Sequence, residues 1–270
     1  MKVAALQMNS RTGLDRNLAQ AEQLLSEAAA AGVELAVLPE NFSYLGAQDA
    51  DRVVAAEAPG DGPAQAFLGE QARRHGMWIV GGTVPIRSGE EGRVFSRSLL
   101  LSPQGSVAAQ YDKLHLFDVE VPGREAESYR ESDTTVPGEH PTVANVPIGR
   151  IGMTVCYDLR FPALFHRLSV LGMDILIVPA AFTVPTGRVH WRALLQTRAF
   201  ESLVYVIAAG QWGEHAQGRQ TWGHSAIVSP WGDLLGMLDS GVGVVTAEID
   251  LDRQLELRRK FPVLAHRREF

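Results

Sequence analysis

Three side chains suited to hydrolysis, those of Glu40, Lys113 and Cys156, each follow a short apolar run. Ligands gather beyond the carboxyl ends of strands in sheets with helical crossovers, so these residues are candidates for one site. A free thiol titrates near pH ~8.5 and needs a neighbouring base or cation to act as a nucleophile at neutral pH. A carboxylate can take that proton and return it to a leaving nitrogen, while a lysine can hold the charge of a tetrahedral intermediate. The pattern indicates a cysteine-dependent hydrolase.

Each of these residues also has an ordinary structural interpretation. A lone cysteine at a strand end is often a small buried apolar residue, as free cysteines commonly are. Glu40 can be a strand-end charge, and Lys113 can be a solvated side chain. The spacing does not show that the three side chains meet, so both interpretations stay open from the residues alone.

The composition excludes several other classes of protein. The chain has 270 residues, 46% of them hydrophobic, and its 25 Lys and Arg against 31 Asp and Glu give a net charge of −6. This balance argues against disorder and against nucleic acid as a partner. The single cysteine excludes an internal disulfide and a cysteine-based zinc site, and it favours a cytoplasmic location. No apolar run reaches the ~20 residues of a membrane span, and Met1–Gln7 predicts a first strand rather than a signal peptide.

Short apolar strands alternate with amphipathic helices along the chain, and these elements must position the reactive residues. Asp15 is the expected N-cap of the first helix. The alternation and the interposed hairpins predict an α/β fold with mixed sheets covered by helices. Because no linker or repeat is found, residues 1–270 are expected to form a single domain. The predicted strands are Val3–Met8, Glu34–Leu38, Met77–Thr83, Phe95–Leu101, Ser106–Tyr111, Arg150–Cys156, Asp174–Val178, Leu203–Ala209, Ala226–Ser229, Leu234–Leu238 and Val244–Ile249, and the predicted helices are 15–31, 63–75, 162–171, 188–201 and one from Leu251.

One long segment, Val121–Thr142, has no sustained hydrophobic period. A structureless stretch of this length inside a compact domain is usually a functional loop. We therefore expect it to form a loop or lid beside the site.

The reactive residues lie in motifs through which the chain resembles the nitrilase superfamily, the carbon–nitrogen hydrolases. The resemblance implies an α-β-β-α sandwich of two sheets, with homodimers, or higher homo-oligomers, that pack helix face to helix face. It implies no metal or organic cofactor. The motifs are Leu38-Pro39-Glu40, Tyr111–Asp118, Val155–Pro162, Pro179–Phe182, Thr186-Gly187, His190-Trp191, Arg198–Glu201 and Pro230–Gly232.

The resemblance also implies roles for the reactive residues. Glu40 would be the general base, Lys113 the oxyanion stabiliser and Cys156 the nucleophile, with the backbone N–H of Tyr157 completing the oxyanion hole. A second glutamate that orients the lysine is expected in the following loop. Glu131 fits its pattern best, and the other candidates, should the loop register differ, are Glu125 and Glu127.

Tyr157-Asp158 after the nucleophile, where true nitrilases typically have Trp-Glu, favours an amidase branch. The chain is similar to the branch of omega-amidases and deaminated glutathione amidases, and its segments 211–225 and 261–268 favour the latter. The expected reaction cleaves the amide of deaminated glutathione, a small 2-oxo acid amide, to 2-oxoglutarate and cysteinylglycine through a thioester. Alternatives are an omega-amidase acting on 2-oxoglutaramate, an N-carbamoyl amino acid hydrolase, and a regulatory or scaffolding homologue without turnover.

Such substrates are anions, so the pocket needs a cation. Arg160, just beyond the nucleophile, is the first candidate, although an ion pair with Asp158 is an equal alternative. Arg188 is the second, at a position where this branch commonly has proline. Trp191 is a further candidate for lining the pocket, and packing of its helix is the alternative role. The remaining candidate pocket residues are Phe182, Thr183 and His190.

Overall fold

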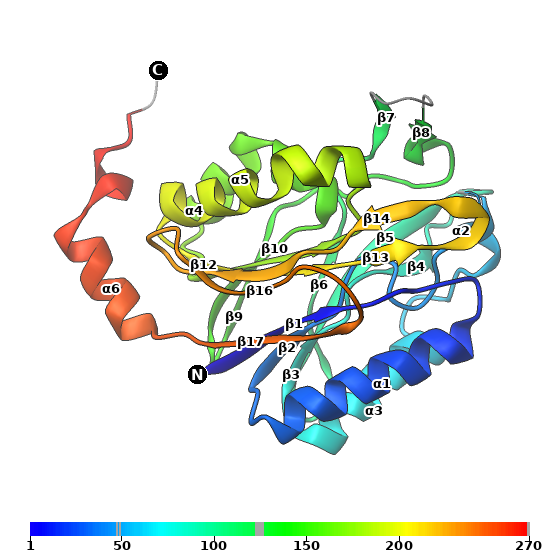
Figure 1. Cartoon of the computed structure of the whole chain (residues 1–270), viewed down its shortest axis with the longest axis horizontal. Coiled ribbons are helices and arrows are strands. Elements are labelled where there is room, and N and C mark those ends of the chain that lie inside the picture. The colour runs from blue at the N-terminus through cyan, green and yellow to red at the C-terminus, as the bar shows by residue number, and fades with distance from the viewer. Residues whose placement is uncertain (47, 49, 122–126, 269–270) are drawn as a thin grey trace.

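The computed structural model describes residues 1–46, 48, 50–121 and 127–268, and for residue 127 the backbone only. Two mixed sheets face each other, and helices cover their outer sides (Figure 1). The first sheet has the order β17 (Gly243–Glu248), β1 (Lys2–Gln7), β2 (Leu35–Val37), β3 (Trp78–Val80), β5 (Val94–Leu101) and β4 (Val84–Arg87), and β6 (Val107–Asp112) also pairs with β5. The second has the order β16 (Leu234–Leu238), β15 (Ser225–Val228), β12 (Tyr205–Gly210), β11 (Ile175–Ala180), β10 (Gly149–Met153) and β9 (Thr142–Val146).

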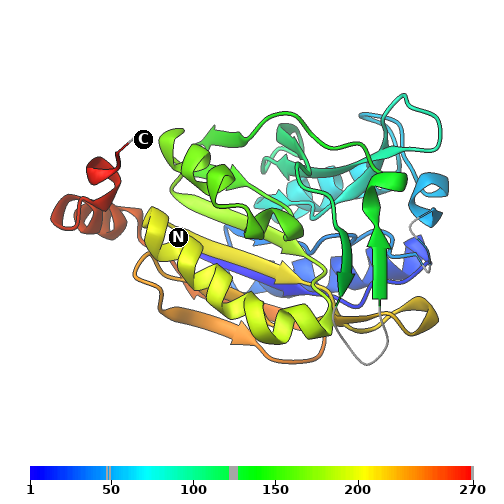
Figure 2. The same ribbon diagram turned by 90° about the horizontal axis from the view of Figure 1, so that it is seen from above.

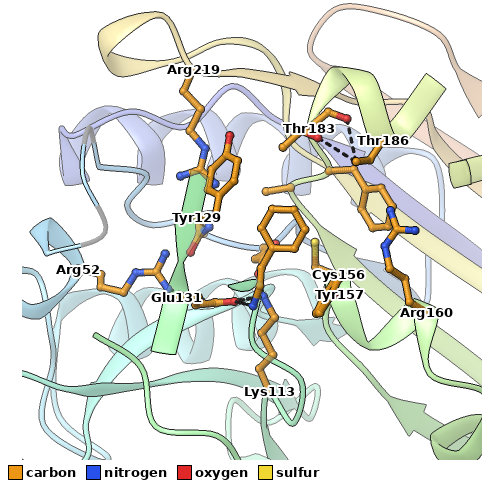
Figure 3. A pocket seen from close by; sticks show the side chains of 15 residues that line it. Arg52, Lys113, Tyr129, Glu131, Cys156, Tyr157, Arg160, Thr183, Thr186 and Arg219 are labelled. Atoms are coloured by element: carbon orange, nitrogen blue, oxygen red, sulfur yellow. Dashed lines mark hydrogen bonds and ion pairs between the residues drawn. The ribbon is translucent and has the colours of Figure 1, made fainter. Parts of the chain in front are cut away.

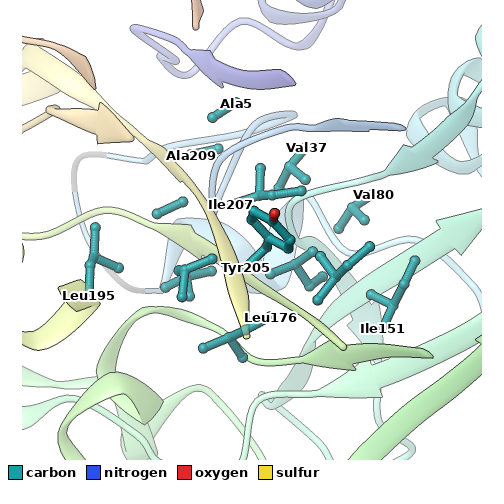
Figure 4. Close-up of a cluster of buried hydrophobic side chains, with 14 of the residues drawn as sticks. Ala5, Val37, Val80, Ile151, Leu176, Leu195, Tyr205, Ile207 and Ala209 are labelled. Atoms are coloured by element: carbon teal, nitrogen blue, oxygen red, sulfur yellow. The ribbon is translucent and has the colours of Figure 1, made fainter. Parts of the chain in front are cut away.

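Each sheet has three adjacent parallel strands, β1, β2 and β3 in the first and β10, β11 and β12 in the second. Parallel strands are covered on both faces and are apolar almost throughout. Along β1, Val3 and Ala5 point between the sheets, while Ala4 and Leu6 point toward the helices outside. Figure 4 shows part of this apolar packing, with Ala5, Val37 and Val80 of the first sheet and Leu195 from a helix outside the second sheet. The period of two along a strand therefore builds two cores on the same sheet.

Helices α1 (Leu14–Ala30) and α3 (Pro63–His75) cover the first sheet, and α4 (Pro162–Val170) and α5 (Val184–Ser202) cover the second (Figure 1). Helix α3 starts at a proline and ends at Gly76, whose φ of 61° suits a residue without a Cβ. Helix α6 (Leu251–Lys260) extends from one end of the molecule (Figure 2). Over the described residues, none of the helices is long and apolar enough to cross a membrane.

The α/β fold and the sandwich expected from the sequence are confirmed, with some boundaries corrected. The N-cap of α1 is Gly13 rather than Asp15, which lies in the first turn, where its carboxylate still suits the helix dipole. Helix α5 begins at Val184, four residues before the predicted start. Pro185 was the missed signal, because proline is well tolerated in the first turn of a helix.

The expectation that Val121–Thr142 is structureless is wrong for residues 127–133, whereas residues 136–141 have no helix or strand, as expected. Strand β7 (Asp118–Val121) pairs antiparallel with β8 (Glu127–Arg130), and a 3₁₀ helix follows at Glu131–Asp133. In a two-stranded hairpin the backbone N–H and C=O groups pair with the partner strand. Such a hairpin can therefore form without a hydrophobic period in its sequence. Further short elements that the sequence pattern did not predict are α2 (Asp51–Val54), β4, β9 and the hairpin of β13 (Trp212–Glu214) and β14 (Gln220–Trp222).

Candidate active site

Glu40, Lys113 and Cys156 line one cavity, and Figure 3 shows Lys113 and Cys156 in its wall. Glu40 follows β2 and Lys113 follows β6, both in the first sheet, whereas Cys156 follows β10 of the second. Lys113 Nζ donates to Glu40 Oε1 at 2.8 Å, and the Glu40 carboxylate is near enough to the Cys156 thiol to raise its pKa. All three side chains are buried. Glu40 therefore lies beside both the cation and the thiol.

Glu131 is the fourth member of this group. Its Oε2 accepts from Lys113 Nζ at 2.8 Å and from the backbone N–H of Phe117 at 2.8 Å. Its Oε1 accepts from Arg52 Nη1 at 3.1 Å. Burial opposes the charge of Glu131, but Lys113 and Arg52 outweigh it and lower the pKa of its carboxyl to about 2. Glu131 is thus a fixed anion that holds the lysine in place.

The pKa values of Lys113 and of the Cys156 thiol are both raised, which keeps the lysine charged and the thiol neutral. Burial disfavours the charged form of Lys113, yet the carboxylates of Glu131 and Glu40 raise its pKa well above the usual range. Burial, together with Glu40, also raises the pKa of the Cys156 thiol, although Lys113 and the Ala181 N–H act in the opposite direction. The resting site therefore holds a protonated lysine and a neutral thiol, so the thiol needs a base during attack.

The backbone around Cys156 is sharply bent. The residue has a φ of 48°, an uncommon value for a non-glycine residue, and it opens the 3₁₀ helix Cys156–Arg160 rather than ending the predicted strand. Asp158, which is fully buried, accepts from the backbone N–H of Val155 at 2.9 Å and from the Tyr111 hydroxyl at 2.7 Å. His115 Nδ1 lies 2.7 Å from the same carboxylate. These bonds hold the bend, as strained residues at functional sites require.

The backbone of Glu40 is fixed from the opposite side. Gln211 Nε2 donates to the Glu40 carbonyl at 3.0 Å and to Ser10 Oγ at 2.7 Å. Gly82 lies against this turn with a φ of 47°, and a Cβ there would come within 2.0 Å of the Pro39 carbonyl oxygen. The close approach explains why this position is glycine.

These groups open onto a cavity lined by polar and aromatic side chains, as small-molecule sites commonly are. Arg160, Phe182 and Thr183, all candidates from the sequence, line it, as does Tyr157 beside the nucleophile. The Arg160 guanidinium lies over the Phe182 ring, 5.4 Å from its centroid. In the described residues Arg160 forms no ion pair with Asp158, which instead contacts His115.

The other sequence candidates lie elsewhere. Arg188 and His190 are exposed on α5 and are not among the described residues that line the cavity, although His190 Nδ1 lies 3.3 Å from Arg160 Nη2. Trp191 is buried, donates to the His224 carbonyl at 2.8 Å and packs on Phe182. It supports the cavity wall without lining it. Glu125 lies outside the described residues, as does the side chain of Glu127.

Several lining residues were not predicted from the sequence. Arg52 comes from the short helix α2, Tyr129 from β8, Arg219 from the turn between β13 and β14, and Thr186 from the first turn of α5. None follows an apolar strand, so no local pattern singles it out. Within the described part of the chain, no group of three or more His, Cys, Asp or Glu side chains is arranged to hold a metal ion.

Comparison with known proteins identifies the family of the chain. The model of the family described as carbon-nitrogen hydrolase matches residues 2–259. A deaminated glutathione amidase from Yersinia enterocolitica is 44% identical over 98% of this chain and 92% of its own length. The NitFhit protein of Caenorhabditis elegans has a crystal structure with a TM-score of 0.91 and 35% identity, and the match covers 99% of this chain and 65% of that one.

A third similar structure is that of an amidase from Nesterenkonia sp. AN1, in which acrylamide has added to the active-site cysteine. It is 25% identical, with a TM-score of 0.80 over 97% of this chain and 99% of that one. The family model covers nearly all of the chain, and relatives with this identity extend along its length. The chain therefore belongs to the carbon–nitrogen hydrolase family and is a hydrolase of carbon–nitrogen bonds other than peptide bonds.

Proposed function

We propose that the protein hydrolyses the amide of deaminated glutathione, giving 2-oxoglutarate and cysteinylglycine. The observation that carries the proposal is the convergence of Glu40, Lys113 and Cys156 on one cavity, where Lys113 Nζ donates to Glu40 Oε1 at 2.8 Å. The name of the Yersinia enterocolitica relative supports the substrate. The Arg160 side chain lines the cavity, and its guanidinium suits an anionic 2-oxo acid.

In the proposed first half of the reaction, Glu40 takes the thiol proton while the Cys156 sulfur attacks the amide carbonyl carbon. The carbonyl electrons move to the oxygen, which Lys113 Nζ and the Tyr157 N–H stabilise. When this intermediate collapses, the carbon–nitrogen bond breaks. Glu40 gives the proton to the leaving nitrogen, and cysteinylglycine departs with a free amino group. A thioester between the 2-oxo acid and Cys156 remains.

In the second half, Glu40 takes a proton from water as the water oxygen attacks the thioester carbonyl. The carbon–sulfur bond breaks, the sulfur recovers its proton from Glu40, and 2-oxoglutarate leaves as the acid product. Glu131 stays ionised throughout and positions Lys113, because its pKa is held near 2. One carboxylate thus serves as the base and the acid in both halves.

An omega-amidase that acts on 2-oxoglutaramate would use the same chemistry with ammonia as the leaving group. The two substrates differ only in the group attached to the leaving nitrogen. We propose deaminated glutathione because the cavity extends beyond the nucleophile to Tyr129 and Arg219. The smaller substrate, 2-oxoglutaramate, has no second group that could reach these two residues. An N-carbamoyl amino acid hydrolase or a non-catalytic homologue is the less supported alternative.

We further propose that the protein acts as a cytoplasmic homodimer. Helix α5 carries Val189 and Phe200, which are 67% and 46% exposed, and Val170 at the end of α4 is 58% exposed. Exposed apolar side chains on adjoining helices are typical of an interface between copies. Sedimentation analysis of the purified protein tests this; a monomer at micromolar concentration would contradict it.

The activity is tested by the release of 2-oxoglutarate from deaminated glutathione and from 2-oxoglutaramate. We expect a higher kcat/KM for deaminated glutathione, and loss of at least about 10³-fold in Cys156→Ala. Ser202→Ala, which also removes one heteroatom from a buried side chain but at the far end of α5, is the matched control and should retain activity. Turnover by Cys156→Ala at the wild-type rate would contradict the mechanism, and preference for 2-oxoglutaramate would contradict the substrate.

A further inference from the structure

Among the described residues, three arginines line the cavity, and they differ in their partners. Arg52 is neutralised by Glu131, with 3.1 Å between Nη1 and Oε1. Arg160 and Arg219 form no ion pair with a carboxylate in the part of the chain that the structure describes. A guanidinium beside a cavity without a carboxylate partner is available to an anionic ligand. The cavity therefore offers two such cations.

Arg219 is held in a defined position. Its guanidinium lies over the Tyr129 ring, with Cζ 5.3 Å from the centroid. Its Nε is buried and has no hydrogen-bond partner among the described residues. A buried donor without a partner carries a free-energy cost. Arg219 also lines the cavity, so its guanidinium is available to an anionic ligand there.

The turn that carries Arg219 is anchored to the body of the protein. The backbone N–H of His215 donates to the Arg219 carbonyl at 2.8 Å. The His215 ring is buried, with Nδ1 2.8 Å from the Ser10 carbonyl and Nε2 2.6 Å from Thr221 Oγ1. The position of Arg219 is therefore set by the fold rather than by a freely moving loop.

The two cations reach the cavity from different sides (Figure 3). Arg160 extends from the 3₁₀ helix that begins at Cys156, and Arg219 comes from the β13–β14 turn, next to Tyr129. A substrate whose scissile carbonyl lies at Cys156 can contact both only when it carries an anionic group on each side of that carbonyl.

We infer that Arg219, backed by Tyr129, binds the terminal glycine carboxylate of the leaving cysteinylglycine portion, while Arg160 faces the 2-oxo acid end. The inference rests on the proposed function, since deaminated glutathione carries one carboxylate at each end, and both are ionised at neutral pH. Arg219 is thereby the residue that selects this substrate over 2-oxoglutaramate, which has only the 2-oxo acid carboxylate.

The test uses two substrates that differ in one group, deaminated glutathione and its glycinamide, in which the terminal carboxylate is a neutral amide. For both, the release of 2-oxoglutarate is measured with the full-length protein. We expect the wild type to favour the carboxylate form by about 10- to 100-fold in kcat/KM. Arg219→Gln should lose this preference through a higher KM for the carboxylate form, with little change for the glycinamide. Arg219→Lys should restore part of the preference.

Arg16→Gln is the matched control, because Arg16 is exposed on α1 and does not line the cavity. It should keep the wild-type preference. Equal losses for both substrates in Arg219→Gln, or no preference in the wild type, would overturn the role of Arg219 while leaving the proposed function intact. Absence of wild-type turnover of deaminated glutathione would instead overturn the proposed function and this inference with it.

Discussion

The cavity has two electrically different parts. The inner cluster, Glu40, Lys113, Glu131 and Cys156, is buried, and its lysine is matched by two carboxylates. The outer arginines, Arg160 and Arg219, are partly exposed, and within the described residues they have no carboxylate partner. The same fold therefore neutralises one set of charges and leaves the other set to be neutralised by a ligand.

Solvent access explains the difference. A charge in the protein interior is costly unless it is paired and hydrogen-bonded, so Lys113 requires Glu40 and Glu131 simply for the protein to fold. A partly exposed guanidinium remains hydrated and needs no internal partner. The inner cluster can thus be rigid before the substrate arrives, which is the condition for electrostatic stabilisation of a transition state. The outer arginines can contribute to binding instead.

Removing the inner cation should have the largest effect. In Lys113→Met, Glu40 and Glu131 lose their shared partner, and we expect a fall of about 10²–10³ in kcat. Leaving buried charges unpaired should also lower the free energy of unfolding by about 3–5 kcal/mol at neutral pH. Kinetics and urea unfolding measure the two effects.

The pH dependence gives a second check on the inner cluster. In the wild type the pKa of Glu131 is about 2, below its usual 4.5, so the stability it contributes is present above pH 4.5 and is lost as pH falls toward 2. Without the lysine, burial favours the protonated carboxyl. The difference in stability between wild type and Lys113→Met should therefore shrink from pH 7 to pH 4. Lys260→Met is the control, because its pair with Glu256 is exposed and screened by solvent, and it should show a much smaller trend.

Removing an outer arginine should affect binding and leave stability intact. For Arg160→Gln we expect KM for deaminated glutathione to rise about 10-fold, with a smaller change in kcat. The melting temperature should stay within about 2 °C of the wild type, because a partly exposed guanidinium contributes little to folding. Arg192→Gln, at an exposed position of α5, serves as the control. A large fall in melting temperature for Arg160→Gln would remove the distinction between the two parts of the cavity.

The last prediction concerns the anchor of the turn that carries Arg219. Burial, with help from Arg219 and Arg11, lowers the pKa of His215 from 6.5 to about 4. The unfolded chain therefore binds this proton more readily, and stability falls as pH decreases from 6.5 to 4, by up to roughly 3 kcal/mol. His215→Gln should be less stable than wild type at pH 7, with the gap narrowing toward pH 4.5 in urea unfolding. His140→Gln, at an exposed histidine, should show a gap that does not change with pH.

The elements that carry the inner cluster could be predicted from the sequence, because their signals are local. The apolar runs before Glu40 and Lys113, and the Pro162 start of α4, set boundaries through hydrophobic period and backbone preference alone. The same local signal predicts a strand that continues to Cys156, whereas β10 ends at Met153. Nothing in an apolar run shows that the chain bends at φ 48° where the Asp158 carboxylate holds the backbone.

The outer part of the cavity could not be predicted, since its residues lie on short elements held by distant ones. Arg219 lies on a turn anchored through His215 to Ser10, more than 200 residues away in the sequence. Arg188 was the second candidate cation after Arg160, but the helical rotation of α5 directs it away from the cavity. A residue's charge is visible in the sequence, whereas its direction depends on what packs beneath it.

The sequence by itself determined the α/β class, the motifs of the family and the three reactive residues, since these depend on residue type, local spacing and backbone preference. Only the tertiary structure decided that Glu40 and Lys113 come from one sheet and Cys156 from the other, and that Arg52 is paired while Arg160 and Arg219 face the cavity. The physical reason is that a side chain's charge state and partners depend on its burial and on residues far away in the chain. The pattern of residues along the sequence does not contain this information.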